Sequence, residues 1–279
     1  MMQSTHTIFN RDAMKSMLFL ASSFILAYCL QITIHEFGHY FAGLLVGAEG
    51  GKIILHPFLN SKVIFQSVPS VQSQVFIGMM GVITDMLFAT TFAFLAWRKK
   101  NVFTLPLLMW GAIAFIGEGI GMLGNIAALP YSFDDVGQLV LLDISPKPLI
   151  PLSIVFVIIG LIMMVLIMPI SGISPKDLFL KKLVAFFCCL PLYFALAILY
   201  LKVFDSQNMD ILDVRMKQLI IGLVFAVLLG LFYKPMDKIL ERIIKTKDVF
   251  QPKWSDILPT FVGCTLVFSS LIAYSCLFN

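Results

Sequence analysis

The sequence predicts an all-α polytopic membrane protein, with about seven transmembrane helices and a short membrane-associated β-hairpin after the first. Three observations lead to this prediction. Apolar residues make up 59% of the 279 residues and charged residues only 13%, a composition unlike that of soluble domains. The mean hydropathy is +0.93. The apolar residues also gather in windows of roughly 20 residues, the length that a helix needs to cross the hydrocarbon core.

The windows give the positions of the expected helices. The first follows a short polar leader, and it is too long for a signal peptide, so we expect it to be retained as a transmembrane helix. Two β-prone runs, residues 52–56 and 62–66, flank a turn after the first window and predict the hairpin. The expected spans are residues 17–46, 71–97, 103–126, 150–170, 180–203, 216–234 and 257–277.

The chain divides into three expected sections: a polar leader over residues 1–16, a core over 17–149, and additional transmembrane helices over 150–279. Assigning the 20 basic residues to loops with the N-terminus in the cytoplasm places 14 on the cytoplasmic side and 6 on the other. This bias predicts a cytoplasmic N-terminus. The net charge of +4 is carried by short loops between helices and gives no sign of nucleic-acid binding.

The first window contains the residues with the clearest chemistry. His35-Glu36-Phe37-Gly38-His39 places two histidines four residues apart, and residues at this spacing share one face of a helix. Two imidazoles on one face, with a carboxylate beside them, are typical of a zinc site in which Glu36 is the general base. Ionisable groups inside an apolar span also indicate function. We therefore expect one Zn²⁺ ion per chain.

Two other spans offer further polar groups. Asp85 lies in the second span, where it is either a hydrogen-bonding post between helices or a direct participant in the chemistry. The third span is rich in glycine and leads into Asn125, Pro130 and the pair Asp134 and Asp135. This pattern suits a tightly packed helix followed by an unwound segment that lines a polar cavity. We expect the third zinc ligand from this segment; taken alone, however, Asp134 and Asp135 fit better with capping or ending a helix at the surface.

These motifs resemble the site-2 protease family of intramembrane zinc metalloproteases over residues 17–140. The His35–Tyr40 segment, followed by Leu45-Val46-Gly47, resembles the motif helix of that family, and residues 52–66 resemble the hairpin that follows it. Gly81 and Asp85 stand where members carry Gly-Pro-x-x-Asn, with Val82 and Asp85 as departures. The segment from Asn125 to Gly137 resembles the Asn-x-x-Pro and Asp-Gly segment, although the Asn-to-Pro spacing is longer and Val136 separates Asp135 from its glycine.

The resemblance implies that His35, His39 and Asp135 bind zinc, with Asp134 as the alternative third ligand. It implies hydrolysis of peptide bonds in transmembrane protein substrates within the lipid bilayer. Asn125 would then stabilise the oxyanion, and a substrate strand would pair with the hairpin. Glu118 is a rival third ligand, as in membrane zinc proteases that use a glutamate. The alternative functions are a catalytically silent, helix-binding pseudoprotease and a metal-handling membrane protein.

Overall fold

The structure is a computed structural model, and it describes residues 11–57, 61–98, 104–127, 145, 147–173, 183–185, 188–204, 216, 219–220, 223–224, 227, 231 and 251–278. The chain forms two compact units. Unit 1 comprises Met1–Leu26 and Val165–Leu266, and unit 2 comprises Ala27–Met164 and Val267–Asn279. The boundaries between these two units lie within helices, and they differ from the boundaries of the three predicted sections. The predicted section boundaries themselves stay a prediction.

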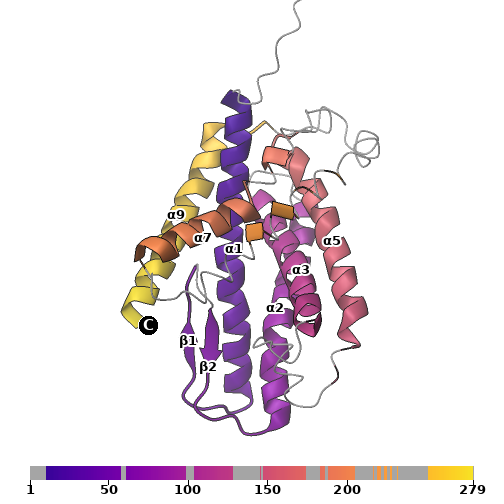
Figure 1. Ribbon diagram of the computed structural model, residues 1–279, viewed down its shortest axis with the longest axis vertical. Coiled ribbons are helices and arrows are strands. Elements are labelled where there is room, and N and C mark those ends of the chain that lie inside the picture. Colours follow the sequence, from indigo (N-terminus) through magenta and orange to yellow (C-terminus); the bar gives the residue numbers. More distant parts are fainter. Residues whose placement is uncertain are drawn as a thin grey trace, which may run out of the picture. The chain divides into compact units, whose positions relative to one another are not determined.

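The described elements are six helices and two strands, which are labelled in Figure 1. The helices are apolar around most of their circumference, as expected for segments that face lipid or other helices and not water. Their bounds are α1 Arg11–Leu45, β1 Lys52–Ile54, β2 Lys62–Ile64, α2 Val71–Arg98, α3 Thr104–Ala127, α5 Leu149–Ile170, α7 Leu190–Phe204 and α9 Trp254–Phe278.

Five of the described helices are long and apolar enough to cross a membrane, in agreement with an all-α membrane protein. They coincide with five of the seven predicted windows. Of the other two windows, 180–203 contains the shorter apolar stretch Pro191–Val203, and 216–234 lies largely outside the described residues, so the count of seven stays a prediction. The candidate spans are Arg11–Leu45, Val71–Leu95, Thr104–Leu123, Leu149–Ile170 and Trp254–Ser275.

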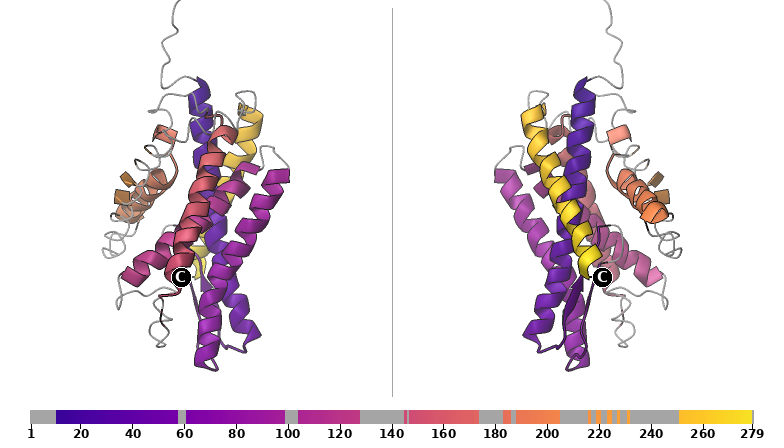
Figure 2. Two further views of the ribbon diagram at one scale, coloured as in Figure 1. Left: turned by 90° about the vertical axis from the view of Figure 1, so that its right-hand side faces the viewer. Right: turned by 90° about the vertical axis from the view of Figure 1, so that its left-hand side faces the viewer.

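In unit 2, glycine brings α1 and α2 into close contact. A Cβ at Gly38 of α1 would lie 2.6 Å from Thr84 Oγ1 and 2.8 Å from the Met80 carbonyl oxygen of α2. No side chain other than hydrogen fits in that gap, so the two backbones can approach closely. Figures 1 and 2 show α2 running beside the C-terminal half of α1. This approach sets the distance between the two helices at the level of the motif.

The remaining helices of unit 2 extend the same packing. α2 packs along α3, where the Phe88 ring stacks on Trp110 with centroids 5.9 Å apart. α3 packs in turn on α5, since a Cβ at Gly119 would lie 2.7 Å from the Ser153 carbonyl oxygen. The helices α1, α2, α3 and α5 therefore support one another in unit 2.

The strands lie beside the end of α1. Gly47 has φ of 75°, and it ends the helix with the Ala48 amide donating to the Gly43 carbonyl at 2.9 Å, the pattern of a Schellman cap. β1 and β2 then pair antiparallel, with Ile53 opposite Val63. Phe65 stacks on Tyr40 of α1 at 6.3 Å between centroids. The turn residues 58–60 of the predicted hairpin lie outside the described residues.

The described part of α9 makes contacts within each of the two units. In unit 1, Gly263 of α9 lies against α1, since a Cβ there would be 3.8 Å from Leu26 Cδ2. In unit 2, the Tyr274 hydroxyl donates a hydrogen bond of 2.7 Å to the Ile53 carbonyl oxygen of β1. The last turns of α9 are thus tied to the strand pair that follows the motif helix.

Candidate metal centre

The two motif histidines converge, as their spacing predicts. His35 and His39 stand one turn apart on α1, and their Nε2 atoms are 3.0 Å from each other. Their rings meet edge to face, with centroids 4.7 Å apart and planes at 82°. Two nitrogens bound tetrahedrally to one zinc ion lie about 3.3 Å apart, because each Zn–N bond is about 2.0–2.1 Å. The separation in this structure is therefore close to the one that a shared zinc ion requires.

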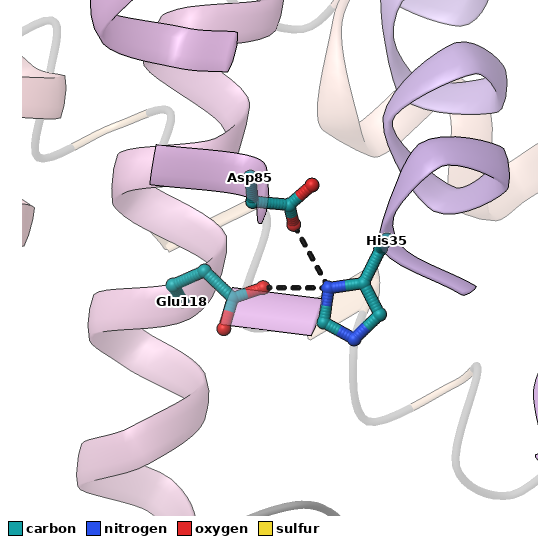
Figure 3. A group of neighbouring side chains, drawn as sticks. All are labelled: His35, Asp85 and Glu118. Carbon is teal, nitrogen blue, oxygen red and sulfur yellow. Dashed lines mark hydrogen bonds and ion pairs between the residues drawn. The ribbon is translucent and has the colours of Figure 1, made fainter. Parts of the chain in front are cut away.

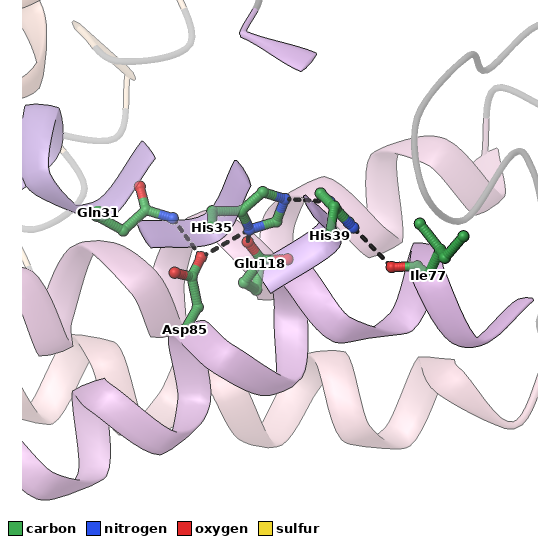
Figure 4. Close-up of polar contacts among 6 residues, drawn as sticks. All are labelled: Gln31, His35, His39, Ile77, Asp85 and Glu118. Atoms are coloured by element: carbon green, nitrogen blue, oxygen red, sulfur yellow. Dashed lines mark hydrogen bonds and ion pairs between the residues drawn. The ribbon is translucent and has the colours of Figure 1, made fainter. Parts of the chain in front are cut away.

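The other nitrogen of each ring has its own partner. His35 Nδ1 lies 2.9 Å from Asp85 Oδ2 on α2, and His39 Nδ1 lies 2.7 Å from the Ile77 carbonyl oxygen on the same helix. Figure 4 shows both contacts, one on each side of the Nε2 pair. Metal-bound histidines nearly always donate the second ring N–H to a carboxylate or a backbone carbonyl. Both kinds of partner are present here.

These partners assign the proton on each ring. The Ile77 carbonyl can only accept, so His39 Nδ1 is the donor. Asp85 Oδ2 accepts a hydrogen bond from Gln31 Nε2, and its second lone pair can accept one from His35 Nδ1 as well. If both imidazoles are neutral, neither Nε2 carries a proton. The 3.0 Å contact between the two Nε2 atoms then suits either a proton that the two rings share or a metal ion on which both lone pairs converge.

Gly81 leaves the space beside this pair open. A Cβ built on Gly81 of α2 would overlap His39 Nε2 and would lie 2.7 Å from His35 Nε2. Any larger residue would therefore fill the volume at the two nitrogens. The donor set, its outer hydrogen bonds and this glycine fit a zinc ion held by the two Nε2 atoms.

A second group of possible metal ligands lies at His35 Nδ1, on the side of the ring away from His39. Glu118 Oε1 of α3 is 3.5 Å from His35 Nδ1, the nitrogen that already faces Asp85. Figure 3 shows the two carboxylates pointing at this one atom from two different helices. One ligand atom from each of His35, Asp85 and Glu118 lies within 4.8 Å of the others, so this trio could also hold a metal ion. It would do so without His39.

The other predicted site residues are placed to different extents. Glu36 lies on α1 between the histidines in sequence, and the residue is only 7% exposed. Asn125 lies on α3, but its side chain is outside what the structure describes, as are Asp134 and Asp135 altogether. Asp85, for which the sequence left open a hydrogen-bonding role between helices or a direct role in the chemistry, is fully buried and contacts a predicted ligand.

The sequence did not predict two groups that form hydrogen bonds at this centre, the Gln31 side chain and the Ile77 carbonyl. Gln31 lies one turn before His35 on α1 and reaches the same carboxylate, Asp85. Its signal was available, because a polar residue in an apolar window at this spacing shares the face of the motif. The Ile77 carbonyl gives no signal in the sequence, because every residue has the same backbone oxygen, whatever its side chain.

Comparisons with known proteins add no family to these observations. No family model, curated protein or solved structure matches the chain. The arguments about function therefore depend on the motif and on the geometry around it.

Proposed function

We propose that this chain is an intramembrane zinc metalloendopeptidase, similar to the site-2 proteases, that cleaves peptide bonds in transmembrane protein substrates. The observation that supports this most strongly is the pair of Nε2 atoms 3.0 Å apart, each ring being held from behind through Nδ1. A histidine buried for packing alone needs no such arrangement, whereas two Nε2 atoms at this separation suit the binding of one cation. The buried Glu36 between the two histidines supports hydrolysis over simple metal storage.

In this proposal, His35 and His39 bind zinc through Nε2, and Asp135 is the third ligand, with Asp134 as the alternative. A bound zinc ion supplies Lewis acidity, which polarises a carbonyl and lowers the pKa of bound water to about 7. Glu118 and Asp85 lie on the Nδ1 side of His35, away from its Nε2 atom, so we do not assign them as ligands of this zinc ion. One zinc ion per chain follows from this assignment.

Glu36 is the general base of the proposed reaction. Its carboxylate takes a proton from the attacking water, and the oxygen of that water forms a bond to the acyl carbon of the substrate. As the peptide C–N bond breaks, Glu36 returns the proton to the departing amine, which balances the hydrolysis. A positioned base of this kind contributes about 10²–10⁴-fold to the rate. The Asn125 amide would donate to the developing oxyanion.

The strand pair is the proposed support for the substrate. A transmembrane helix keeps its carbonyls in internal hydrogen bonds, so it must unwind before it can be cleaved. β1 and β2 lie directly after the motif helix and pack on it through Phe65 and Tyr40. We propose that this hairpin associates with the membrane and holds an unwound segment as an added strand. We also propose seven spans and a cytoplasmic N-terminus.

The test compares membranes that contain wild type with membranes that contain Glu36→Gln. Mapping of new N-termini by mass spectrometry needs no known substrate. We expect cleavage within transmembrane segments with wild type, its loss with Glu36→Gln, and the same zinc content in both. Identical termini with both proteins, in the presence of bound zinc, would instead support the helix-binding or metal-handling alternative.

A further inference from the structure

The sequence leaves Asp85 with two roles, and the structure gives it a specific partner on each side. Its Oδ2 atom is 2.9 Å from His35 Nδ1 and accepts a hydrogen bond from Gln31 Nε2. Gln31 and His35 both project from α1, one turn apart, whereas Asp85 comes from α2, as Figure 4 shows. The three side chains therefore form a chain of hydrogen bonds that ends on a proposed zinc ligand.

We infer that Asp85 is a positioning residue, whose carboxylate is held by Gln31 against His35 Nδ1 and thereby fixes His35 Nε2 for metal binding. This inference rests on the proposed zinc site. His39 is supported differently, by the neutral carbonyl of Ile77 at 2.7 Å. The two histidines are thus unequal, and His35 is the one supported by a negative charge.

Only one of the two carboxylate oxygens of Asp85 is needed for the contact with His35, so the difference between aspartate and asparagine at this position is the charge. Asp85 is 0% exposed, and its Oδ1 atom accepts no hydrogen bond from any residue that the structure describes. One acceptor oxygen is enough to hold the His35 N–H, and an asparagine would supply that oxygen equally well. What a carboxylate adds is negative charge, which strengthens the hydrogen bond from the ring N–H and so holds the ring more firmly as a ligand.

Glu118 provides a matched comparison for the effect of charge alone. Its Oε1 atom is 3.5 Å from the same Nδ1, beyond the usual N–H···O distance of about 2.7–3.2 Å. Glu118→Gln therefore removes one nearby negative charge without removing the short contact to His35. Comparing substitutions at the two positions therefore separates the effect of a charge that is hydrogen-bonded to His35, at Asp85, from that of a charge that is only nearby, at Glu118.

The experiment measures the rate at which zinc dissociates from the purified, zinc-loaded full chain into an excess of chelator. Removing an outer partner of a metal-bound histidine weakens metal binding by about 10–100-fold. We expect Asp85→Asn to raise the rate about tenfold and Asp85→Leu about a hundredfold. Glu118→Gln should change it much less than Asp85→Asn. Gln31→Leu alone should raise the dissociation rate above that of wild type. Added to Asp85→Leu, it should have no further effect, because the carboxylate that Gln31 holds is already absent.

Circular dichroism of each metal-free variant checks that the helices form, and the nearly isosteric Asp85→Asn keeps the test valid if Asp85→Leu does not fold. Unchanged zinc dissociation in Asp85→Asn and Asp85→Leu would overturn the positioning role while leaving the zinc site intact. An effect of Glu118→Gln as large as that of Asp85→Asn would also overturn it. A wild-type protein that binds no zinc would overturn both proposals together.

Discussion

His35 Nε2 lies 3.0 Å from His39 Nε2, and this contact connects two residues whose other ring nitrogens both face α2. One helix therefore supplies the two proposed histidine ligands, and its neighbour sets their orientation. The interface between α1 and α2 consequently matters as much to the proposed chemistry as the motif itself.

Gly81→Ala should abolish zinc binding, because the new methyl group would overlap His39 Nε2 and come within 2.7 Å of His35 Nε2. Zinc content per purified chain measures this effect. Gly263→Ala is the matched control, since the nearest atom that a Cβ there would meet is Leu26 Cδ2 at 3.8 Å, an ordinary van der Waals distance. Wild-type zinc content in Gly81→Ala would mean that the ion is not bound beside this glycine.

The third ligand can be assigned by removing each acidic candidate in turn. We expect Asp135→Ala to lose most of the bound zinc, and Asp134→Ala and Glu118→Ala to retain it. The reason for the last expectation is that Glu118 lies at His35 Nδ1, at 3.5 Å, and not where the two Nε2 atoms meet. Metal analysis of the three purified variants decides the matter. Loss of zinc only in Glu118→Ala would move the third ligand to α3.

Tyr274→Phe should loosen the strand pair without unfolding the helices. The substitution removes the hydroxyl that donates to the Ile53 carbonyl oxygen at 2.7 Å, a bond with a net contribution of about 0.5–1.5 kcal/mol. Hydrogen exchange should become up to about tenfold faster at the amides of residues 52–54. Exchange within α2 serves as the internal control. Unchanged exchange in β1 would show that Tyr274 does not restrain this strand.

The sequence predicted the centre only as far as local spacing can reach. The facing pair His35 and His39 follows from helical geometry, and the five described spans follow from apolar length. The link from His35 to Asp85 joins residues 50 positions apart, so it depends on how α1 packs on α2. That packing is set by the close contact at Gly38 and Thr84. No periodicity in either helix specifies this contact.

The residues that contact the two histidines differ in how far a sequence can predict them. A carboxylate in an apolar window indicates a role but not its partner, as Asp85 illustrates. A backbone oxygen such as that of Ile77 cannot be predicted before the helices are placed. Gln31 could have been found, because it shares the motif face one turn before His35.

The zinc content of His39→Ala, measured beside that of wild type, tests the central claim most directly. Wild type should contain about one zinc ion per chain and His39→Ala almost none, because the proposed site needs both Nε2 atoms. The trio of His35, Asp85 and Glu118 could hold a metal without His39. Full zinc content in His39→Ala would therefore contradict the account and place the ion at that trio, and a wild type without zinc would contradict it outright.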